Sequence, residues 1–188
     1  MKSPRTTHSV ADAGISMRFA SISEIDALND IDLDASVLFE RAGLHMDFAD
    51  DHEFAIAERQ RWNAAVNAGT TLVAVDARDE RIGFAAVGVL DGEPYLAQLS
   101  VRASCMRRGV GSALVGAAAG MLSQAGARVL WLTTYGHLPW NRSFYERRGF
   151  EMIPADGWGP EMNRQLLLER RWLPRPDERV VMRKAIGA

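Results

Sequence analysis

The chain has 188 residues, 47% of them hydrophobic, so a single domain can bury a sizeable core without a metal or a disulfide. Its formal charge of -2 gives no overall attraction to nucleic acids or anionic membrane surfaces, and neither is expected as a partner. Cys105 is the only cysteine, which excludes an intramolecular disulfide and a thiolate metal cluster and suits a reducing compartment.

The first fourteen residues are small and polar, and they hold no apolar stretch of the kind that a secretory signal needs. No run in the chain approaches the roughly 20 apolar residues of a membrane span. We therefore expect a flexible tail over residues 1–14, a single domain over residues 15–188 and a cytoplasmic location.

The first half of this domain mixes helical and strand patterns. Ser21 and Glu24 have the spacing of a capping box, which predicts that a helix begins there. The polar residues 76–80 separate two apolar, β-branched runs and predict a hairpin turn. The expected elements are a strand at 15–20, a helix from Ser21 through Val37, an irregular acidic connection at 43–51, a helix at 53–67, and strands at 70–75, 82–90 and 95–101.

The second half alternates helix and strand. Apolar residues from Val110 to Leu122 recur at helical spacing until Gly126, which predicts a helix lying on a sheet. Pro139 and Gly149 stand where a short helix begins and ends. The remaining expected elements are a buried strand at 129–133, a short strand at 150–153, a helix at 161–171 and a strand at 179–185.

A short basic, glycine-bearing turn joins the strand at 95–101 to the helix that begins at Val110. Unpaired backbone N–H groups and the positive end of the helix converge there, which favours phosphate oxygens. Gly109 and Gly111 lack a Cβ, so a phosphate ester can approach the backbone closely. Arg107 and Arg108 add positive charge beside the turn.

Three other kinds of glycine-bearing turn join a strand to a helix. A P-loop needs a Lys after its second glycine, but Ser112 and Ala113 follow Gly111. A dinucleotide fingerprint needs Gly or Ala where Leu114 stands and an acidic residue at the end of the next strand, where residues 133–135 are Thr, Thr and Tyr. The third kind is a tight turn that only packs the helix on the sheet.

The spacing from Val101 to the two glycines, together with the segment from Pro139 to Phe150, resembles the GNAT superfamily of N-acetyltransferases. The resemblance is closest over residues 72–153. It implies a mixed α/β fold with a central, mostly antiparallel twisted sheet flanked by helices, in which the strand before the glycine turn splays from its neighbour. It also implies acetyl-CoA as the co-substrate, and it assigns the cofactor to Leu99, Ser100, Val101, Arg107, Arg108, Gly109, Val110, Gly111, Ser112 and Asn141.

Two positions depart from the family pattern. Met106 stands where the family usually has Gln or Arg, and Ala103 stands where Pro is common. Neither change removes a backbone N–H group from the turn. Met106 lacks a side-chain donor toward phosphate or ribose, which Arg107 and Arg108 can replace.

Asn141 and Tyr145 lie four residues apart, so they project from one face of a short helix. In the family the tyrosine matching Tyr145 sits near the cofactor sulfur. When an amine attacks the thioester, CoA leaves as a thiolate of pKa about 8.5, to which a phenol of pKa about 10 can donate a proton. We assign Tyr145 as the general acid. The alternative is a tyrosine that packs on the core and positions the sulfur through a hydrogen bond.

The general base is open, because Ala97 stands where relatives often have Glu. Glu93, His137 or an acidic residue of the segment 43–53 could act through water. The resemblance implies that a primary amine of a small molecule or peptide attacks acetyl-CoA directly in a ternary complex. It also implies that chains of this fold often form homodimers. The missing carboxylate supports an alternative, a non-catalytic acyl-CoA-binding or sensing domain.

A cluster of His and Asp lies in the acidic connection. Its spacing matches neither a helical ligand pair nor a known metal loop, so no metal is expected. Its negative charge could attract an ammonium substrate, although a solvated loop has the same composition. The cluster comprises His45, Asp47, Asp50, Asp51 and His52.

Overall fold

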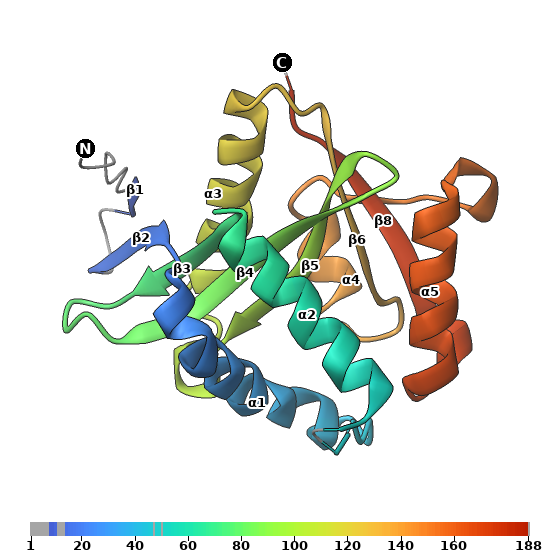
Figure 1. Ribbon diagram of the computed structural model, residues 1–188, viewed down its shortest axis with the longest axis horizontal. Coiled ribbons are helices and arrows are strands. Elements are labelled where there is room, and N and C mark those ends of the chain that lie inside the picture. Colours follow the sequence, from blue (N-terminus) through green and yellow to red (C-terminus); the bar gives the residue numbers. More distant parts are fainter. Residues whose placement is uncertain (1–7, 11–13, 47, 50, 188) are drawn as a thin grey trace.

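The computed structural model describes residues 8–10, 14–46, 48–49 and 51–187 (Figure 1). The strands are β1 His8–Val10, β2 Ile15–Phe19, β3 Thr71–Val75, β4 Arg81–Leu90, β5 Glu93–Val101, β6 Val129–Tyr135, β7 Glu151–Met152 and β8 Arg179–Ala185. The α-helices are α1 Ile25–Arg41, α2 Glu53–Asn67, α3 Val110–Gln124, α4 Arg142–Glu146 and α5 Pro160–Trp172. Single turns of 3-10 helix are η1 Ile22–Glu24, η2 Ala103–Cys105, η3 Ala155–Gly157 and η4 Pro176–Glu178.

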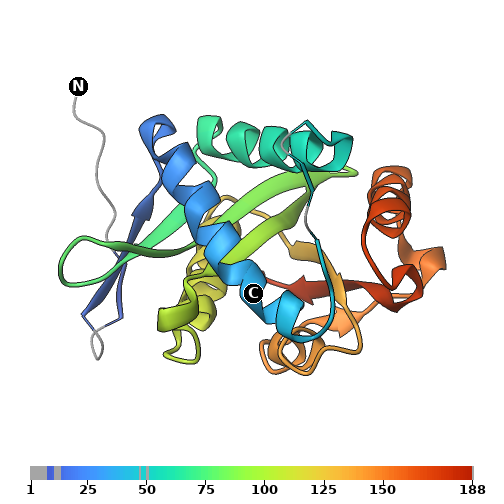
Figure 2. The same cartoon turned by 90° about the horizontal axis from the view of Figure 1, so that it is seen from below.

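The strands form one sheet in the order β1-β2-β3-β4-β5-β6-β8-β7. Neighbouring strands are antiparallel, with the exception of β5 and β6, which are parallel. The helices lie on both faces of this sheet (Figures 1 and 2). The mixed α/β fold with a central, mostly antiparallel sheet is therefore confirmed.

Both faces of the middle of the sheet are buried, because alternate residues of each strand point to opposite sides. Leu72 and Ala85 pack with α3 on one face. Val73 and Phe84, each next to one of these residues in the chain, pack with α1 and α2 on the other face. This two-sided burial explains why β3 and β4 read as continuous apolar runs in the sequence.

The helix and strand boundaries follow the sequence closely at most places. The backbone N–H of Ser21 donates to Glu24 Oε2 at 2.9 Å, as the capping-box spacing predicts, and a 3-10 turn precedes α1. The helix expected from Pro139 begins at Arg142, because residues 138–141 form a turn in which Asn141 donates to the carbonyl of Leu138. His8–Val10 pair with β2 within the expected tail, and residues 1–7 and 11–13 lie outside the described residues.

Strand β5 carries a bulge at the point where the sheet opens. Gln98 pairs with Ala86 and Leu96 pairs with Val87, so Ala97 is the extra residue on β5. On its other side, β5 pairs with β6 only through Tyr95 and Trp131. No further residue pair joins the two strands between there and their ends at Val101 and Tyr135. The splay that the family resemblance implied is therefore present.

Candidate functional site

The turn between β5 and α3 is built to leave backbone N–H groups free. Arg107 and Gly109 have positive φ angles, 61° and 86°, and Gly109 is the N-cap residue of α3. Ala113 donates to the carbonyl of Gly109 at 3.0 Å. The N–H groups of residues 107–112 find no acceptor within the described part of the chain. Together with the positive end of α3, they form a site suited to an anion.

The two glycines of the turn have different roles. A Cβ on Gly109 would meet nothing within 4 Å, so its requirement is the left-handed backbone conformation. A Cβ on Gly111 would lie 3.4 Å from Cζ of Phe144. A Cβ at that distance makes an ordinary van der Waals contact, so the short helix α4 packs against the first turn of α3 beside Gly111 and brings two segments far apart in the sequence side by side.

Arg148 is a third cation at this turn, and its position was not evident from the sequence. Its guanidinium lies 3.5 Å from the centre of the Phe144 ring and donates to the Ser112 hydroxyl and to the carbonyl of Phe144. The residue belongs to the segment that carries the family resemblance. No local pattern indicates that its side chain reaches the start of α3, because that contact depends on how α4 packs.

The end of β5 presents its backbone, rather than its side chains, toward β6. Leu99 and Val101 pack against the core that contains α3. Ser100 points to the opposite face, where its hydroxyl donates to Asp32 Oδ1 of α1 at 2.6 Å. The N–H and C=O groups on the β6 side of this segment are the part of residues 99–101 that a cofactor arm could pair with.

Asn141 and Tyr145 lie at the start and near the end of α4. Tyr145 donates its backbone N–H to the carbonyl of Asn141 at 3.1 Å. The Asn141 side-chain amide makes no hydrogen bond to the described residues. Between these two residues, Phe144 is the side chain of α4 that meets Gly111 of the glycine turn.

The phenol of Tyr145 is held by aromatic contacts. Its ring meets the rings of Phe144 and Phe150 edge-on, at centroid distances of 5.0 and 5.5 Å. Burial raises the pKa of the phenol, and the charges of Arg179 and Arg148 offset only part of that rise. The hydroxyl makes no hydrogen bond to any described residue. Tyr145 is thus protonated at neutral pH and has a proton available to donate.

The bases suggested by the sequence differ in where the structure places them. Glu93 is the first residue of β5, about 20 Å along the strand from Leu99 at the usual rise per residue. His137 is exposed and paired with Glu178. In the acidic connection, Nδ1 of His52 accepts the N–H of Phe54 and caps α2.

Asp47 and Asp50 of the acidic connection lie outside the described residues. Among the residues that are described, no group of three or more His, Cys, Asp or Glu could hold a metal ion. In the same part of the chain no helix is long and apolar enough to cross a membrane.

A polar network lies beneath the point where β5 and β6 separate. Glu169 of α5 is paired with Arg179 of β8 at 2.6 Å and accepts from Thr133 of β6 at 2.6 Å. The hydroxyl of Thr133 also lies 2.7 Å from that of Tyr95, the residue of the last β5–β6 pair. Gln165 donates to Glu169 at 2.8 Å and accepts from Arg61 of α2 at 2.7 Å. The network fixes α2 and α5 to the sheet at this point.

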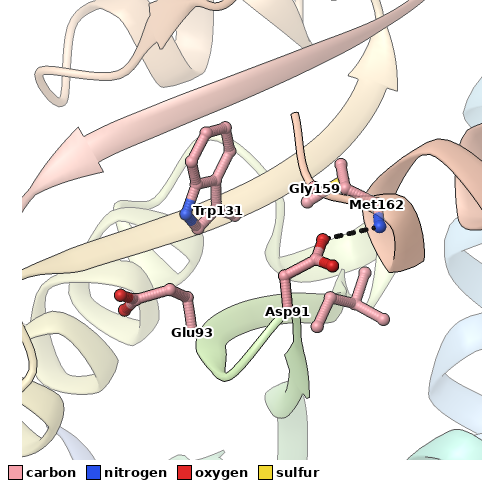
Figure 3. Close-up of a pocket in the computed structure, with 6 residues that line it drawn as sticks. Asp91, Glu93, Trp131, Gly159 and Met162 are labelled. Atoms are coloured by element: carbon pink, nitrogen blue, oxygen red, sulfur yellow. Dashed lines mark hydrogen bonds between the residues drawn. The ribbon is translucent and has the colours of Figure 1, made fainter. Parts of the chain in front are cut away.

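A small cavity of about 60 Å³ lies at the other end of β5 (Figure 3). It is lined by Leu90, Asp91, Glu93, Trp131, Gly159 and Met162. The carboxylate of Asp91 accepts the N–H groups of Glu161 and Met162, both at 2.9 Å, and so caps the start of α5. This cavity is separate from the glycine turn, and the Asp91 carboxylate in its wall has a structural role.

The sequence matches the model of the acetyltransferase (GNAT) family over residues 35–150. The match spans more than half of the chain and includes the splayed strand, the glycine turn and α4. The protein belongs to the acetyltransferase (GNAT) family.

Solved structures of this family share the fold. One is the PaiA N-acetyltransferase of Thermoplasma acidophilum in complex with coenzyme A, with 16% identity and a TM-score of 0.65, covering 91% of this chain and 98% of that one. A phosphinothricin acetyltransferase of Sinorhizobium meliloti in complex with AcCoA has 20% identity and a TM-score of 0.63, with coverage of 93% and 89%. The ribosomal-protein-S18-alanine N-acetyltransferase of Escherichia coli has 16% identity and a TM-score of 0.61, with coverage of 93% and 95%.

Proposed function

We propose that the protein transfers the acetyl group of acetyl-CoA to a primary amine of a small molecule or a peptide, by direct attack in a ternary complex. The observation that carries the proposal is the combination of two features at one place. The unpaired edges of β5 and β6 end beside a turn whose N–H groups at residues 107–112 are free. An extended arm that ends in a pyrophosphate fits this combination.

In this proposal the pyrophosphate of acetyl-CoA lies on the backbone of residues 107–112 with the charges of Arg107, Arg108 and Arg148 around it. The pantetheine arm pairs with the backbone of residues 99–101. The amide of Asn141 contacts the cofactor from α4. The family membership and the CoA and AcCoA complexes of the structural neighbours support this choice of cofactor.

The chemistry follows from the thioester. The lone pair of a neutral amine forms a bond to the carbonyl carbon, a tetrahedral oxyanion results, and the C–S bond then breaks. The electron pair of that bond stays on sulfur, and the phenol of Tyr145 supplies the proton that makes the leaving group a thiol. The high pKa of the phenol keeps this proton in place until charge develops on sulfur.

Calorimetric titration with acetyl-CoA, NAD and ATP tests the cofactor. We expect saturable binding of acetyl-CoA and of CoA, because both carry the pyrophosphate and the pantetheine arm. Binding of NAD or ATP in place of acetyl-CoA would overturn the assignment.

The acceptor is tested by following the release of free CoA with a panel of primary amines. The panel holds polyamines, aromatic monoamines, amino acids, aminoglycosides and peptides with free N-termini. Among the structural neighbours, one is named for ribosomal-protein-S18 alanine and another for phosphinothricin, so both peptide and small-molecule amines are included. Amine-dependent release of CoA supports the proposal. Binding of acetyl-CoA without such release would favour the alternative, a non-catalytic acyl-CoA sensor that lacks a carboxylate at Ala97.

A further inference from the structure

Asp32, in the middle of α1, is a carboxylate that the proposed reaction has not yet used. Its Oδ1 accepts hydrogen bonds from the hydroxyl of Ser100, at 2.6 Å, and from the amide of Gln98. Its other oxygen, Oδ2, accepts no hydrogen bond from the described residues. One oxygen is thus fixed to β5 while the second is left for another partner.

The position of Asp32 relative to the open strand is defined by its two partners. Gln98 and Ser100 belong to the part of β5 beyond the last pair with β6. Their side chains meet α1, whereas Leu99 and Val101 pack on the face that carries α3. The backbone of Leu99, where the proposal places the cofactor arm, therefore lies between Asp32 and the α3 face.

Tyr145 packs on the α3 face of the sheet. Asp32 approaches the same stretch of β5 from the α1 face. The entering amine and the departing sulfur are bonded to the carbonyl carbon from different directions. The base that serves the amine and the acid that serves the sulfur therefore need to stand on different sides of the thioester. Asp32 and Tyr145 approach β5 from opposite faces of the sheet, as this requirement demands.

No cation is paired with Asp32 from the elements around it within the described structure. On α1, Asp30 is exposed and Asp34 accepts the N–H of Ala103 at 2.6 Å. On β5 the partners, Gln98 and Ser100, are uncharged. Burial raises the pKa of Asp32, and the two hydrogen bonds lower it by less. The carboxylate is therefore a stronger base than an ordinary aspartate.

We propose that Asp32 is the general base of the acetyl transfer, a role that rests on the proposed function. Oδ2 of the carboxylate takes a proton from the nitrogen of the acceptor ammonium and becomes a carboxylic acid. The freed lone pair on nitrogen then forms the C–N bond, and the C–S electron pair leaves with sulfur. Sulfur takes the phenol proton of Tyr145, and the acylated nitrogen gives up its second proton, which restores that phenol through water. Asp32 returns its own proton to water, so that the ammonium and acetyl-CoA yield the amide, CoA as its thiol and one proton.

The first test compares Asp32→Asn with Asp30→Asn, an exposed carboxylate two residues earlier on the same helix. The assay uses the amine of the panel that releases CoA fastest, at saturating acetyl-CoA, across pH. We expect Asp32→Asn to lower kcat/KM for the amine by about 100-fold at pH 7. We also expect the variant to lack the decrease in kcat/KM that the wild type shows as the pH falls and Asp32 becomes protonated. Its affinity for acetyl-CoA is expected to stay within about twofold. Asp30→Asn is expected to behave as the wild type.

Ser100→Ala provides the second test and does not depend on how well Asp32→Asn folds. Removing the hydroxyl donor raises the pKa of Asp32, since the ionised form loses a hydrogen bond. The acid limb of the rate profile should therefore move to higher pH, which a purely structural contact would not cause. A wild-type acid limb in Asp32→Asn, or an unmoved limb in Ser100→Ala, overturns the role of Asp32 alone. Absence of CoA release by the wild type with every amine overturns the proposed function itself.

Discussion

At the scale of single residues, the environment of each side chain decides what it can do in the proposed reaction. Tyr145 has a raised pKa because the rings of Phe144 and Phe150 and the core exclude water from it. Arg148 is held over an aromatic ring with its charge directed at the first turn of α3. The first residue therefore stays protonated at neutral pH, and the second suits an anionic ligand.

Tyr145→Phe removes the phenol proton and keeps the ring. We expect kcat to fall by about 100-fold, within the range for general acids, while the affinity for acetyl-CoA changes by less than about threefold. Because the pKa of the wild-type phenol is raised, its ionisation should cause no loss of rate below about pH 10. Steady-state rates and calorimetry check these points. Full turnover by the variant across pH would exclude both proton donation and a hydrogen bond to sulfur, and would leave the ring only a packing role.

Arg148→Ala should weaken acetyl-CoA binding by about tenfold, because a charged hydrogen-bonding group is lost beside the pyrophosphate. S-acetyl-pantetheine has no pyrophosphate, so its KM should not change. Arg147→Ala, at the exposed neighbouring position, is the control and should leave both values unaltered. An equal loss for both acetyl donors would place the effect of Arg148 in packing rather than in phosphate binding.

At the scale of elements, the bulge at Ala97 and the close approach of α4 to α3 shape the site. The bulge bends β5 where its pairing with β6 ends. Helix α4 packs against the first turn of α3 through Phe144, and Arg148 reaches Ser112 there. The site therefore depends on two local irregularities of otherwise regular elements.

Substitutions of two glycines in α3 test helix stability and cofactor binding separately. Gly116 is exposed, and a Cβ there would meet nothing within 4 Å. Gly116→Ala should raise the free energy of unfolding by about 0.5–1 kcal/mol and leave the affinity for acetyl-CoA unchanged. Gly111→Ala should weaken acetyl-CoA binding by about tenfold, since its methyl group would stand where the proposal brings a phosphate oxygen close to the backbone. Denaturant unfolding and calorimetry measure both. Unchanged binding in Gly111→Ala would mean that the phosphate does not approach the backbone at Gly111.

At the scale of the whole molecule, helices on both faces are fixed to one sheet, and the polar network around Glu169 joins α2, α5, β5, β6 and β8. Burial by itself raises the pKa of Glu169, but the charge of Arg179 and the donors around the carboxylate outweigh it and lower the pKa. A carboxylate of lowered pKa stabilises the fold above its unfolded-state pKa, and this contribution is lost as the pH falls toward the folded value.

Glu169→Gln leaves Arg179 buried without its counter-charge. We expect the free energy of unfolding at pH 7 to fall by about 3 kcal/mol, and the loss of stability on acidification below about pH 4.3 to become shallower than in the wild type. Glu40→Gln, an exposed change on α1, is the control and should stay within about 0.5 kcal/mol of the wild type. Urea titrations at several pH values measure this. Equal stabilities of the two variants would contradict the role of the network.

Local patterns in the sequence were enough to predict most elements. The bounds of α2 and β8 are those expected, because apolar periodicity and turn residues act over a few neighbours. The glycine turn could likewise be predicted, because glycine is the residue that adopts the left-handed backbone conformation found at Gly109. The short helix α4 was expected to start at Pro139 but starts at Arg142, because the turn at 138–141 comes first.

By itself, the sequence determined the class of fold, the family and the position of the glycine turn, since each depends on residues close together in the chain. Only the tertiary structure decided which distant side chains reach that turn. Arg148 meets Ser112 across 36 positions, and Asp32 meets Ser100 across 68. Neither contact has a local signal, because each depends on how whole helices pack on the sheet.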